Sequence, residues 1–253
     1  MIESENIIKK IKEKKELSGI DSSIVKQHLD SYLAKNKLSL GNLSPPQLKI
    51  VVRDIRENLR KNVGRFKASF KDRRKLLEKN DINGLLKTHS STKERFDFYP
   101  KLKAIIKKLA PHSILDLGCG INPLALAEPG VRYYAADINL DDLEIVNLFF
   151  KKNKIEGNAF FCDLNNIGSC KIPKTDLTLV FKVFDILGEK DFETAMQVME
   201  KINSKNIIVS FSTRTISGKR MNRPRRVWFE KLLNSILYKF EVLASDNEVF
   251  YII

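Results

Sequence analysis

Apolar residues recur at three- and four-residue spacing through the first third of the chain, which is the pattern of amphipathic helices. Asp21 stands immediately before one such series, and Ser44 with two following prolines stands before another. Both are favourable helix starts, because a short polar side chain caps the first turn and proline fits within it. The pattern predicts helices over residues 4–17, from 21, from 44, over 65–79 and over 81–86, and hence an all-helical domain over residues 1–88.

After residue 110 the pattern changes to short apolar runs that alternate with amphipathic helices. A continuous apolar run such as 175–181 predicts a parallel strand that is covered on both faces. Strands alternating with helices indicate an α/β fold, and the last two runs are spaced for an antiparallel hairpin. The sequence predicts a domain over 89–253 with a Rossmann-like, mostly parallel seven-stranded sheet, whose strands span 113–117, 131–137, 158–164, 175–181, 206–211, 238–244 and 248–253.

The turn over residues 116–123, after the first of these strands, carries a clear chemical signal. Gly118 and Gly120 allow a ligand to approach the main chain, and Asn122 is predicted to cap the helix that the following proline begins. A dinucleotide site favours three glycines and no carboxylate at this place. Asp116 instead suits a cationic, amine-bearing ligand. The turn therefore favours S-adenosylmethionine (SAM) over NAD, with an ordinary ligand-free turn as the alternative.

Acidic residues also end the next two predicted strands. Asp137 lies about 20 residues beyond the glycines, where Rossmann-like folds hold the ribose hydroxyls of a nucleotide. Asp163 ends the third strand, in a position suited to accept a hydrogen bond from the adenine amino group. Three acids at the ends of three successive strands indicate the fold of SAM-dependent methyltransferases.

The charge distribution is strongly asymmetric. The formal net charge is +14, and residues 1–88 hold 21 Lys and Arg against 11 Asp and Glu. Too few acids are available there to balance the cations, so we expect contact with a polyanion such as RNA. The alternative is a solvated helix face. The candidate RNA-binding residues in this half of the chain are Arg53, Arg56, Arg60, Arg73 and Arg74.

The predicted loop over 212–226 is a second basic segment and contains no acid. It follows the fifth strand, at the edge where open α/β sheets bind ligands, so we expect it to contact RNA. A solubilising loop is the alternative. Trp228 is a candidate for stacking a flipped base, with core packing as its other role. No residue is assigned a definite catalytic role, and Trp228 and Arg214 are the candidates. The RNA-binding candidates here are Arg214, Lys219, Arg220, Arg223, Arg225 and Arg226.

The remaining composition argues against several other classes of protein. Three cysteines without a C-x-x-C pair suggest neither a disulfide framework nor a zinc site, so no metal is expected. No apolar run approaches the length of a membrane span, and the first residues lack the pattern of a signal peptide. We therefore expect a cytoplasmic protein without a membrane partner.

Three segments resemble the motifs of a known family. His89-Ser-Ser-Thr-Lys-Glu-Arg95 resembles H-x-S-T-x-E-R, and Leu115-Asp-Leu-Gly-Cys-Gly-Ile-Asn-Pro-Leu-Ala125 is similar to L-D-x-[AG]-C-G-x-N-P-L-A. Val209-Ser-Phe-Ser-Thr-Arg214 resembles V-S-F-P-T-[KR]. The family is that of the aminoglycoside-resistance 16S ribosomal RNA methyltransferases that act on guanine N-7, and the resemblance covers roughly residues 88–253.

The resemblance implies roles for individual residues. Arg95 would hold the carboxylate of SAM, and Gly118 would contact its methionine part. Asp137 would bind the ribose, while Asp163 and Leu164 would frame the adenine. With Asp116 and Gly120 from the glycine turn, these residues make up the expected cofactor site.

The function implied is SAM-dependent methylation of 16S-type ribosomal RNA, at guanine N-7 in the decoding region of the 30S subunit, with aminoglycoside resistance as one biological role. Guanine N-7 has a free lone pair, so alignment without a general base suffices. Ser212 replaces the family's common proline, and Phe184-Asp185 replaces a more apolar, proline-containing run. These departures leave the target base open. The alternatives are methylation of another RNA, or a ribosome-binding assembly factor with a vestigial SAM pocket. A monomer is expected.

Overall fold

The computed structural model describes residues 4–62, 70–187, 192–215 and 218–253. Its first three helices pack on one another and form a core of their own, whose fully buried members include Ile11, Leu29 and Ile55. Asp21 caps the second helix by accepting a hydrogen bond from the Ser23 N–H, as the sequence predicts. These elements are α1 (Ser4–Lys12), α2 (Ser22–Lys35), a short 3-10 helix η1 (Leu40–Asn42) and α3 (Pro45–Asn62).

The rest of the described chain surrounds one seven-stranded sheet with the order β3-β2-β1-β4-β5-β7-β6. The pairs among β1 to β5 are parallel, and β7 is antiparallel to both β5 and β6. The sheet confirms the predicted Rossmann-like α/β fold with a closing hairpin. The strands are β1 (Ser113–Leu117), β2 (Arg132–Asp137), β3 (Gly157–Phe161), β4 (Thr175–Phe181), β5 (Ser204–Ser212), β6 (Glu241–Ala244) and β7 (Glu248–Ile252).

Helices cover both faces of the sheet, so alternate residues of a strand enter different cores. Ile114 of β1 packs into the core that the helices preceding β3 cover, and Leu115 packs into the core on the opposite face. The helices of the first face are α4 (Phe70–Glu78), α5 (Ile82–Leu86), α6 (Ser90–Arg95), η2 (Phe96–Phe98), α7 (Tyr99–Leu109), α8 (Pro123–Leu126) and α9 (Leu140–Lys152). Those of the second are η3 (Leu164–Ser169), α10 (Val183–Leu187), α11 (Phe192–Lys201) and α12 (Val227–Ser235).

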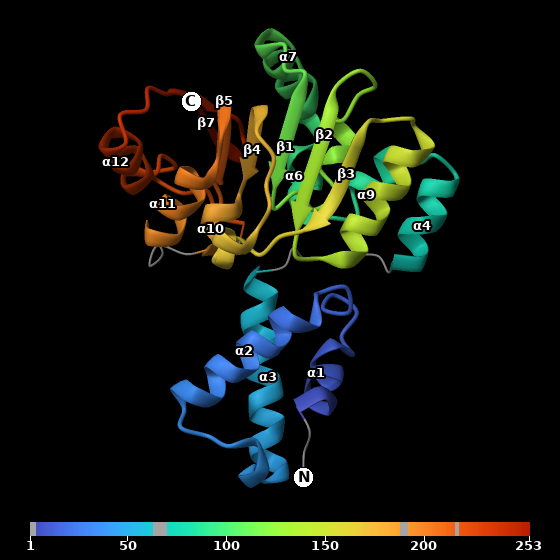
Figure 1. Cartoon of the computed structure of the whole chain (residues 1–253), viewed down its shortest axis with the longest axis vertical. Helices are drawn as coiled ribbons and strands as arrows, with labels where there is room; N and C mark the ends of the chain where they lie inside the picture. The colour runs from blue at the N-terminus through green and yellow to red at the C-terminus, as the bar shows by residue number, and fades with distance from the viewer. Residues whose placement is uncertain (1–3, 63–69, 188–191, 216–217) are drawn as a thin grey trace.

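The helices α1 to α3 lie beyond the carboxyl ends of the parallel strands, the ends to which the arrowheads of β1 and β3 point in Figure 1. The connection between α1 and α2 pairs with the segment that follows β2. Leu140 donates its N–H to the Gly19 carbonyl at 2.7 Å, and Asp21 donates its N–H to the Ile138 carbonyl at 3.3 Å. We call this pairing of residues 19–21 with residues 138–140 the clasp. It holds the N-terminal helices against the edge where the predicted cofactor residues lie.

Several local predictions need correction. The first helix ends at Lys12 rather than Leu17. The third parallel strand ends at Phe161, because the backbone turns there into η3, for which Asp163 is the N-cap. The helix α10 has no counterpart among the predictions, since its five residues are too few to show a helical period. The predicted start of the helix over 65–79 lies outside the described residues, and the described helix α4 begins at Phe70.

The predicted absence of a disulfide is also wrong for one pair. Cys162 and Cys170 are joined, with a Cα–Cα distance of 5.5 Å, and Cys119 is a buried free thiol. Their spacing of eight residues matches none of the motifs used to recognise paired cysteines, so only the fold brings them together.

The division of the chain at residue 88 stays a prediction. By packing, α4 and α5 belong with the sheet, because Leu77, Leu85 and Leu86 share a core with β1, β2 and β4. The helices α1 to α3 share a separate core. Within the described part of the chain, no helix combines the length and apolar character needed to cross a bilayer.

Candidate functional site at the carboxyl edge of the sheet

The turn after β1 adopts the conformation that its glycines allow. Gly118 and Gly120 have φ of +65° and +48°, a region that residues with side chains avoid. A Cβ on Gly118 would lie 2.5 Å from Cγ2 of Val183, and one on Gly120 would lie 3.0 Å from Nε2 of His89. The N–H of Cys119 donates to the Ala136 carbonyl at 3.0 Å, which holds the turn against β2. The turn therefore requires glycine for both backbone and space.

Asp116 lies at the base of this turn and is fully buried. It accepts hydrogen bonds from Nδ2 of Asn122 and from the hydroxyl of Tyr133, both at 2.8 Å. Burial raises the pKa of Asp116 to about 6. Asn122 stands at the predicted N-cap position of α8 but forms no capping hydrogen bond, because its side chain turns inward to Asp116. The sequence does not indicate Tyr133, since it reads as one more apolar strand residue.

Asp137, at the end of β2, faces the same turn. Its Oδ2 accepts from the N–H of Gly120 at 2.8 Å, and its Oδ1 accepts from the N–H of Asn139 at 2.9 Å. Burial raises the pKa of Asp137 to about 6, and the charge of Asp142 acts in the same direction. One buried and one half-buried carboxyl with raised pKa values favour a cationic ligand, because a positive charge stabilises their ionised forms. The described residues at this edge therefore fit the sulfonium and ammonium groups of SAM, as well as its ribose hydroxyls.

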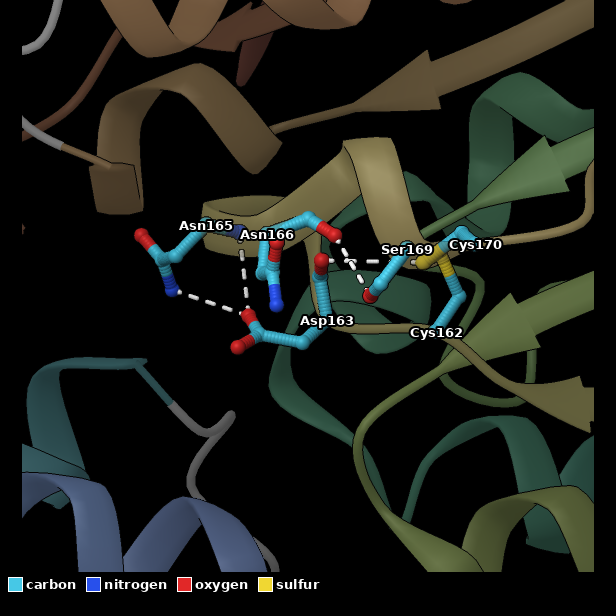
Figure 2. Close-up of a disulfide and its surroundings, with 6 residues drawn as sticks. All are labelled: Cys162, Asp163, Asn165, Asn166, Ser169 and Cys170. Carbon is cyan, nitrogen blue, oxygen red and sulfur yellow. Dashed lines mark hydrogen bonds between the residues drawn. A yellow bond between two sulfur atoms is a disulfide. The ribbon is translucent and has the colours of Figure 1, made fainter.

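Asp163 and Leu164 begin η3 beside the disulfide (Figure 2). The Asp163 carboxylate points away from the Cys162–Cys170 bond and accepts from the N–H and the Nδ2 of Asn165, at 3.0 and 3.1 Å. Leu164 is buried. Burial lowers the pKa of His28 on α2, and the charge of Asp163 opposes that effect. The N-terminal helices are thus close enough to interact electrostatically with the acid predicted to face adenine.

Arg95 lies inside the protein rather than on its surface. Its side chain is 1% exposed, its Nη2 lies 3.0 Å from Oε2 of Glu248, and its Nη1 donates to Oδ1 of Asn122 at 3.2 Å. The guanidinium also lies over the ring of Phe181, 4.6 Å from its centroid. Arg95 is therefore connected to Asp116 through Asn122. Its predicted contact with the carboxylate of SAM stays a prediction.

Glu248 is a member of this network that sequence reasoning missed. It also accepts from the Ser210 hydroxyl at 2.7 Å and lies 3.4 Å from Nζ of Lys182. The available signal was an acid at the head of an otherwise apolar terminal strand, which indicates a buried partner for a cation. The residues that could hold a SAM carboxylate, Arg95 and Lys182, are thus both linked to one internal carboxylate.

The cations of the N-terminal half differ in their availability to RNA. The prediction that Arg73 binds RNA needs correction, because its side chain is 3% exposed and forms a buried ion pair with Asp142. Arg56 is mostly covered, since it donates to the carbonyls of Lys10 and Ile11 and links α3 to α1. Arg60 pairs with Glu16. The exposed cations among the candidates are Arg53, Arg60 and Arg74. The acids beside Arg53 and Arg60 are half-buried, and the acid beside Arg74 is exposed.

The loop between β5 and α12 shows the same division. Arg214 donates to the side chain of Asn247 at 2.7 Å, Arg225 pairs with Glu230, and Arg226 pairs with Asp185. Arg220 lies 3.4 Å from Asp246 in an exposed pair. Lys219 and Arg223 are exposed. The cations free to meet a phosphate in the described part of this loop are therefore chiefly Lys219, Arg220 and Arg223.

Trp228 is partly buried at the start of α12. Its ring meets the rings of Phe211 and Phe229 edge to face, with centroids 5.9 and 5.6 Å apart. It therefore packs against the core of the second face and keeps part of its surface accessible. In the described residues, the His, Cys, Asp and Glu side chains form no group of three able to hold a metal ion.

Comparison with known proteins gives consistent matches. The family model described as "Ribosomal RNA methyltransferase (FmrO)" matches residues 59–252. A protein of Serratia marcescens named 16S rRNA (guanine(1405)-N(7))-methyltransferase is 31% identical over 183 residues, which cover 70% of this chain and 71% of the relative. A protein of the same name from Proteus mirabilis is 29% identical over 187 residues, which cover 70% of this chain and 66% of the relative.

Two solved structures share the fold over nearly their whole length. The structure of the 16S rRNA methylase RmtB has a TM-score of 0.75 and 22% identity, and the match covers 100% of this chain and 98% of that one. The 16S rRNA methyltransferase RmtF, solved in complex with S-adenosyl-L-homocysteine (SAH), has a TM-score of 0.76 and 19% identity with the same coverage.

Proposed function

Because the chain belongs to the ribosomal RNA methyltransferase (FmrO) family and is a SAM-dependent methyltransferase, we propose that it methylates N-7 of a guanine in 16S-type ribosomal RNA. The observation that carries the proposal is the acidic edge formed by buried Asp116 and half-buried Asp137 against a turn with two glycines at positive φ. Such an edge suits a cationic methyl donor. The identity of the methyl acceptor is inferred from the relatives, which are named for methylation of a 16S rRNA guanine at N-7.

Positioning is the chemistry that this site supports. SAM supplies an electrophilic methyl group, and guanine N-7 supplies a lone pair without losing a proton. The task of the protein is then to hold the two partners in line and to exclude water. Asp137 is proposed to accept from the ribose hydroxyls, and Asp163 and Leu164 to frame the adenine. Gly118 and Gly120 allow the methionine part to approach, while Arg95 and Asp116 support it from within.

The acceptor is proposed to be held by two basic surfaces. One consists of exposed cations of the N-terminal segment, residues 1–88, including Arg53 and Arg74. The other consists of Lys219, Arg220 and Arg223 in the loop before α12. Trp228, beside that loop, is proposed to contact the target base. The proposed substrate is the 30S subunit. We propose that the protein acts on it in the cytoplasm and as a monomer.

Mapping the methylated nucleotide tests the proposal. Purified protein is incubated with isotopically labelled SAM and with 30S subunits, 50S subunits or protein-free 16S RNA. We expect one N-7-methylguanosine in the decoding region of the 30S sample, located by mass spectrometry of nuclease fragments. Methylation confined to another RNA would instead favour a methyltransferase of different target. Binding to 30S without binding SAH would favour an assembly factor with a vestigial pocket.

The biological role needs a separate measurement. Methylation at guanine N-7 in the decoding region removes an acceptor that an aminoglycoside can use and adds a positive charge. If the proposed activity confers resistance, a susceptible bacterium expressing the wild-type chain should tolerate higher aminoglycoside concentrations than one expressing Asp137→Ala. Equal tolerance with confirmed methylation would indicate a housekeeping modification.

A further inference from the structure

The carboxylate of Asp185 lies between the two ends of the basic loop that connects β5 to α12. Its Oδ2 accepts from the N–H of Ser212, the last residue of β5, at 2.5 Å. Its Oδ1 accepts from Nη2 of Arg226, the residue before α12, at 2.8 Å. Nη2 of Arg226 also donates to the Ser212 carbonyl at 2.9 Å. The three residues form a closed set of contacts, which we call the neck of the loop.

Further contacts hold Arg226 in the neck. Its guanidinium lies 5.3 Å from the centroid of the Phe211 ring, and its backbone N–H donates to the hydroxyl of Tyr251 at 2.8 Å. The side chain is 12% exposed. Its charge is therefore used within the protein, and its predicted contact with an RNA phosphate stays a prediction. A partly buried ion pair is also stronger than an exposed one, because water screens it less.

The two departures from the family motif meet in this neck. Proline has no backbone N–H, so the common residue at position 212 cannot donate the hydrogen bond that Ser212 gives to Asp185. Asp185 stands where a more apolar run is usual. The two substitutions therefore supply the donor and the acceptor of one contact.

The short helix that carries Asp185 also touches the cofactor turn. Val183, two residues earlier on α10, occupies the space beside Gly118, where an added Cβ would meet its Cγ2 at 2.5 Å. The first residue of α10 is thus packed against the turn that receives the methyl donor, and its middle residue, Asp185, holds the neck. The loop emerging from that neck carries the exposed cations Lys219, Arg220 and Arg223.

We propose that Asp185 is a positioning residue that fixes the basic loop relative to the methyl donor. It acts through Ser212 and Arg226 and touches neither the donor nor the RNA. The inference rests on the proposed function, because the loop matters only if the acceptor is RNA. It predicts that losing Asp185 misplaces the acceptor more than it weakens RNA binding, since the exposed cations remain.

The experiment compares Asp185→Ala and Asp185→Asn with the control Asp246→Asn. Asp246 is a matched control because its exposed carboxylate pairs with Arg220 of the same loop outside the neck. Two readouts are taken on the full chain: trypsin cleavage within residues 213–225, and the methylation rate of 30S under single-turnover, saturating conditions. SAH affinity by calorimetry and the melting temperature establish that each variant is folded.

We expect both Asp185 variants to be cleaved in the loop several times faster than wild type and the control. Their maximal methylation rate should fall at least about tenfold, because a small misplacement of reacting atoms is costly. SAH affinity and 30S affinity should each stay within about twofold. Asp185→Ala combined with Arg226→Ala should be about as slow as Asp185→Ala alone, since both remove the same contact.

Loop cleavage equal to wild type would overturn the neck as a restraint, whatever the substrate proves to be. Faster cleavage with an unchanged maximal rate, in a wild type that methylates 30S, would overturn the positioning role. A wild type that leaves 30S unmethylated contradicts the proposed function instead, and the cleavage readout still decides whether Asp185 holds the loop. Should Asp185→Ala fail to fold, Asp185→Asn keeps the shape of the side chain and carries both tests.

Discussion

Oδ2 of Asp137 accepts the N–H of Gly120 at 2.8 Å, so the acid that ends β2 and the glycine turn that follows β1 form one unit. If the ribose of SAM binds to this carboxylate, Asp137→Ala removes a charge-assisted hydrogen bond worth about 1.5–3 kcal/mol. We expect SAH affinity, measured by calorimetry, to fall by roughly 10- to 150-fold. Asp176→Ala is the control, because Asp176 lies at the opposite end of the sheet beside His112. Unchanged affinity in a folded Asp137→Ala protein would refute the assignment.

Cofactor affinity should depend on pH near 6. Burial raises the pKa of Asp116 and of Asp137 to about 6, whereas the pKa of an unfolded aspartate is about 4. Between pH 4 and pH 6 the folded protein keeps protons on these two groups that the unfolded chain has lost. The two groups therefore stabilise the ligand-free protein at pH 4, and this contribution is lost as the pH rises through 6. A cationic ligand prefers the ionised forms, so SAM affinity should fall as pH drops from 7 to 5. Calorimetry across this range checks the trend, and Asp137→Asn should flatten it.

Gly118 should tolerate no side chain. Gly118→Ala forces a residue with a Cβ to φ of +65° and places that Cβ against Val183, so we expect destabilisation of more than about 1 kcal/mol in urea unfolding. Adding Val183→Ala removes the collision and leaves the backbone strain. The double variant should therefore recover part of the lost stability. No recovery would mean that backbone strain accounts for the whole effect.

Two neighbouring arginines on α4 should behave in opposite ways. Arg73→Ala leaves the buried carboxylate of Asp142 without its partner and should destabilise the protein by about 3–5 kcal/mol. Arg74 is 53% exposed, so Arg74→Ala should change stability little. If Arg74 meets a phosphate, its loss should instead reduce the slope of log affinity for 30S against log salt concentration by about one. A salt slope equal to that of wild type would remove Arg74 from the RNA contact.

Much of the fold follows from periodicity. The strand from Ser113 to Leu117 and the strand from Thr175 to Phe181 begin and end where their apolar runs do, because both lie in the middle of a sheet covered on both faces. The ends of the edge strand β3 were harder to predict, since an edge strand has only one neighbouring strand and a less regular pattern of apolar residues. Its predicted acid, Asp163, lies after the strand and caps a short helix instead.

The candidate site was predictable where chemistry sits at strand ends and unpredictable where it depends on long-range pairing. Asp116, Asp137 and the two glycines are brought together by parallel topology alone. Glu248 reaches Arg95 across 153 positions of sequence, and Asp142 reaches Arg73 across 69. No local pattern of the sequence indicates which charged residue pairs with a residue so distant in the chain. The sequence therefore contains no sign that Arg73 and Arg226 pair with acids inside the protein.

Because of the clasp, the position of the N-terminal helices can be followed through one backbone amide of the methyltransferase domain. The amide of Leu140 donates to the Gly19 carbonyl, and Ile20 beside it is fully buried. If α1 to α3 swing away while the sheet stays folded, the Leu140 hydrogen loses its acceptor, whereas amides inside β1 keep theirs. Deuterium uptake at Leu140 thus measures how often the two parts separate, and a fall in uptake on adding 30S subunits would report ribosome capture at a single hydrogen.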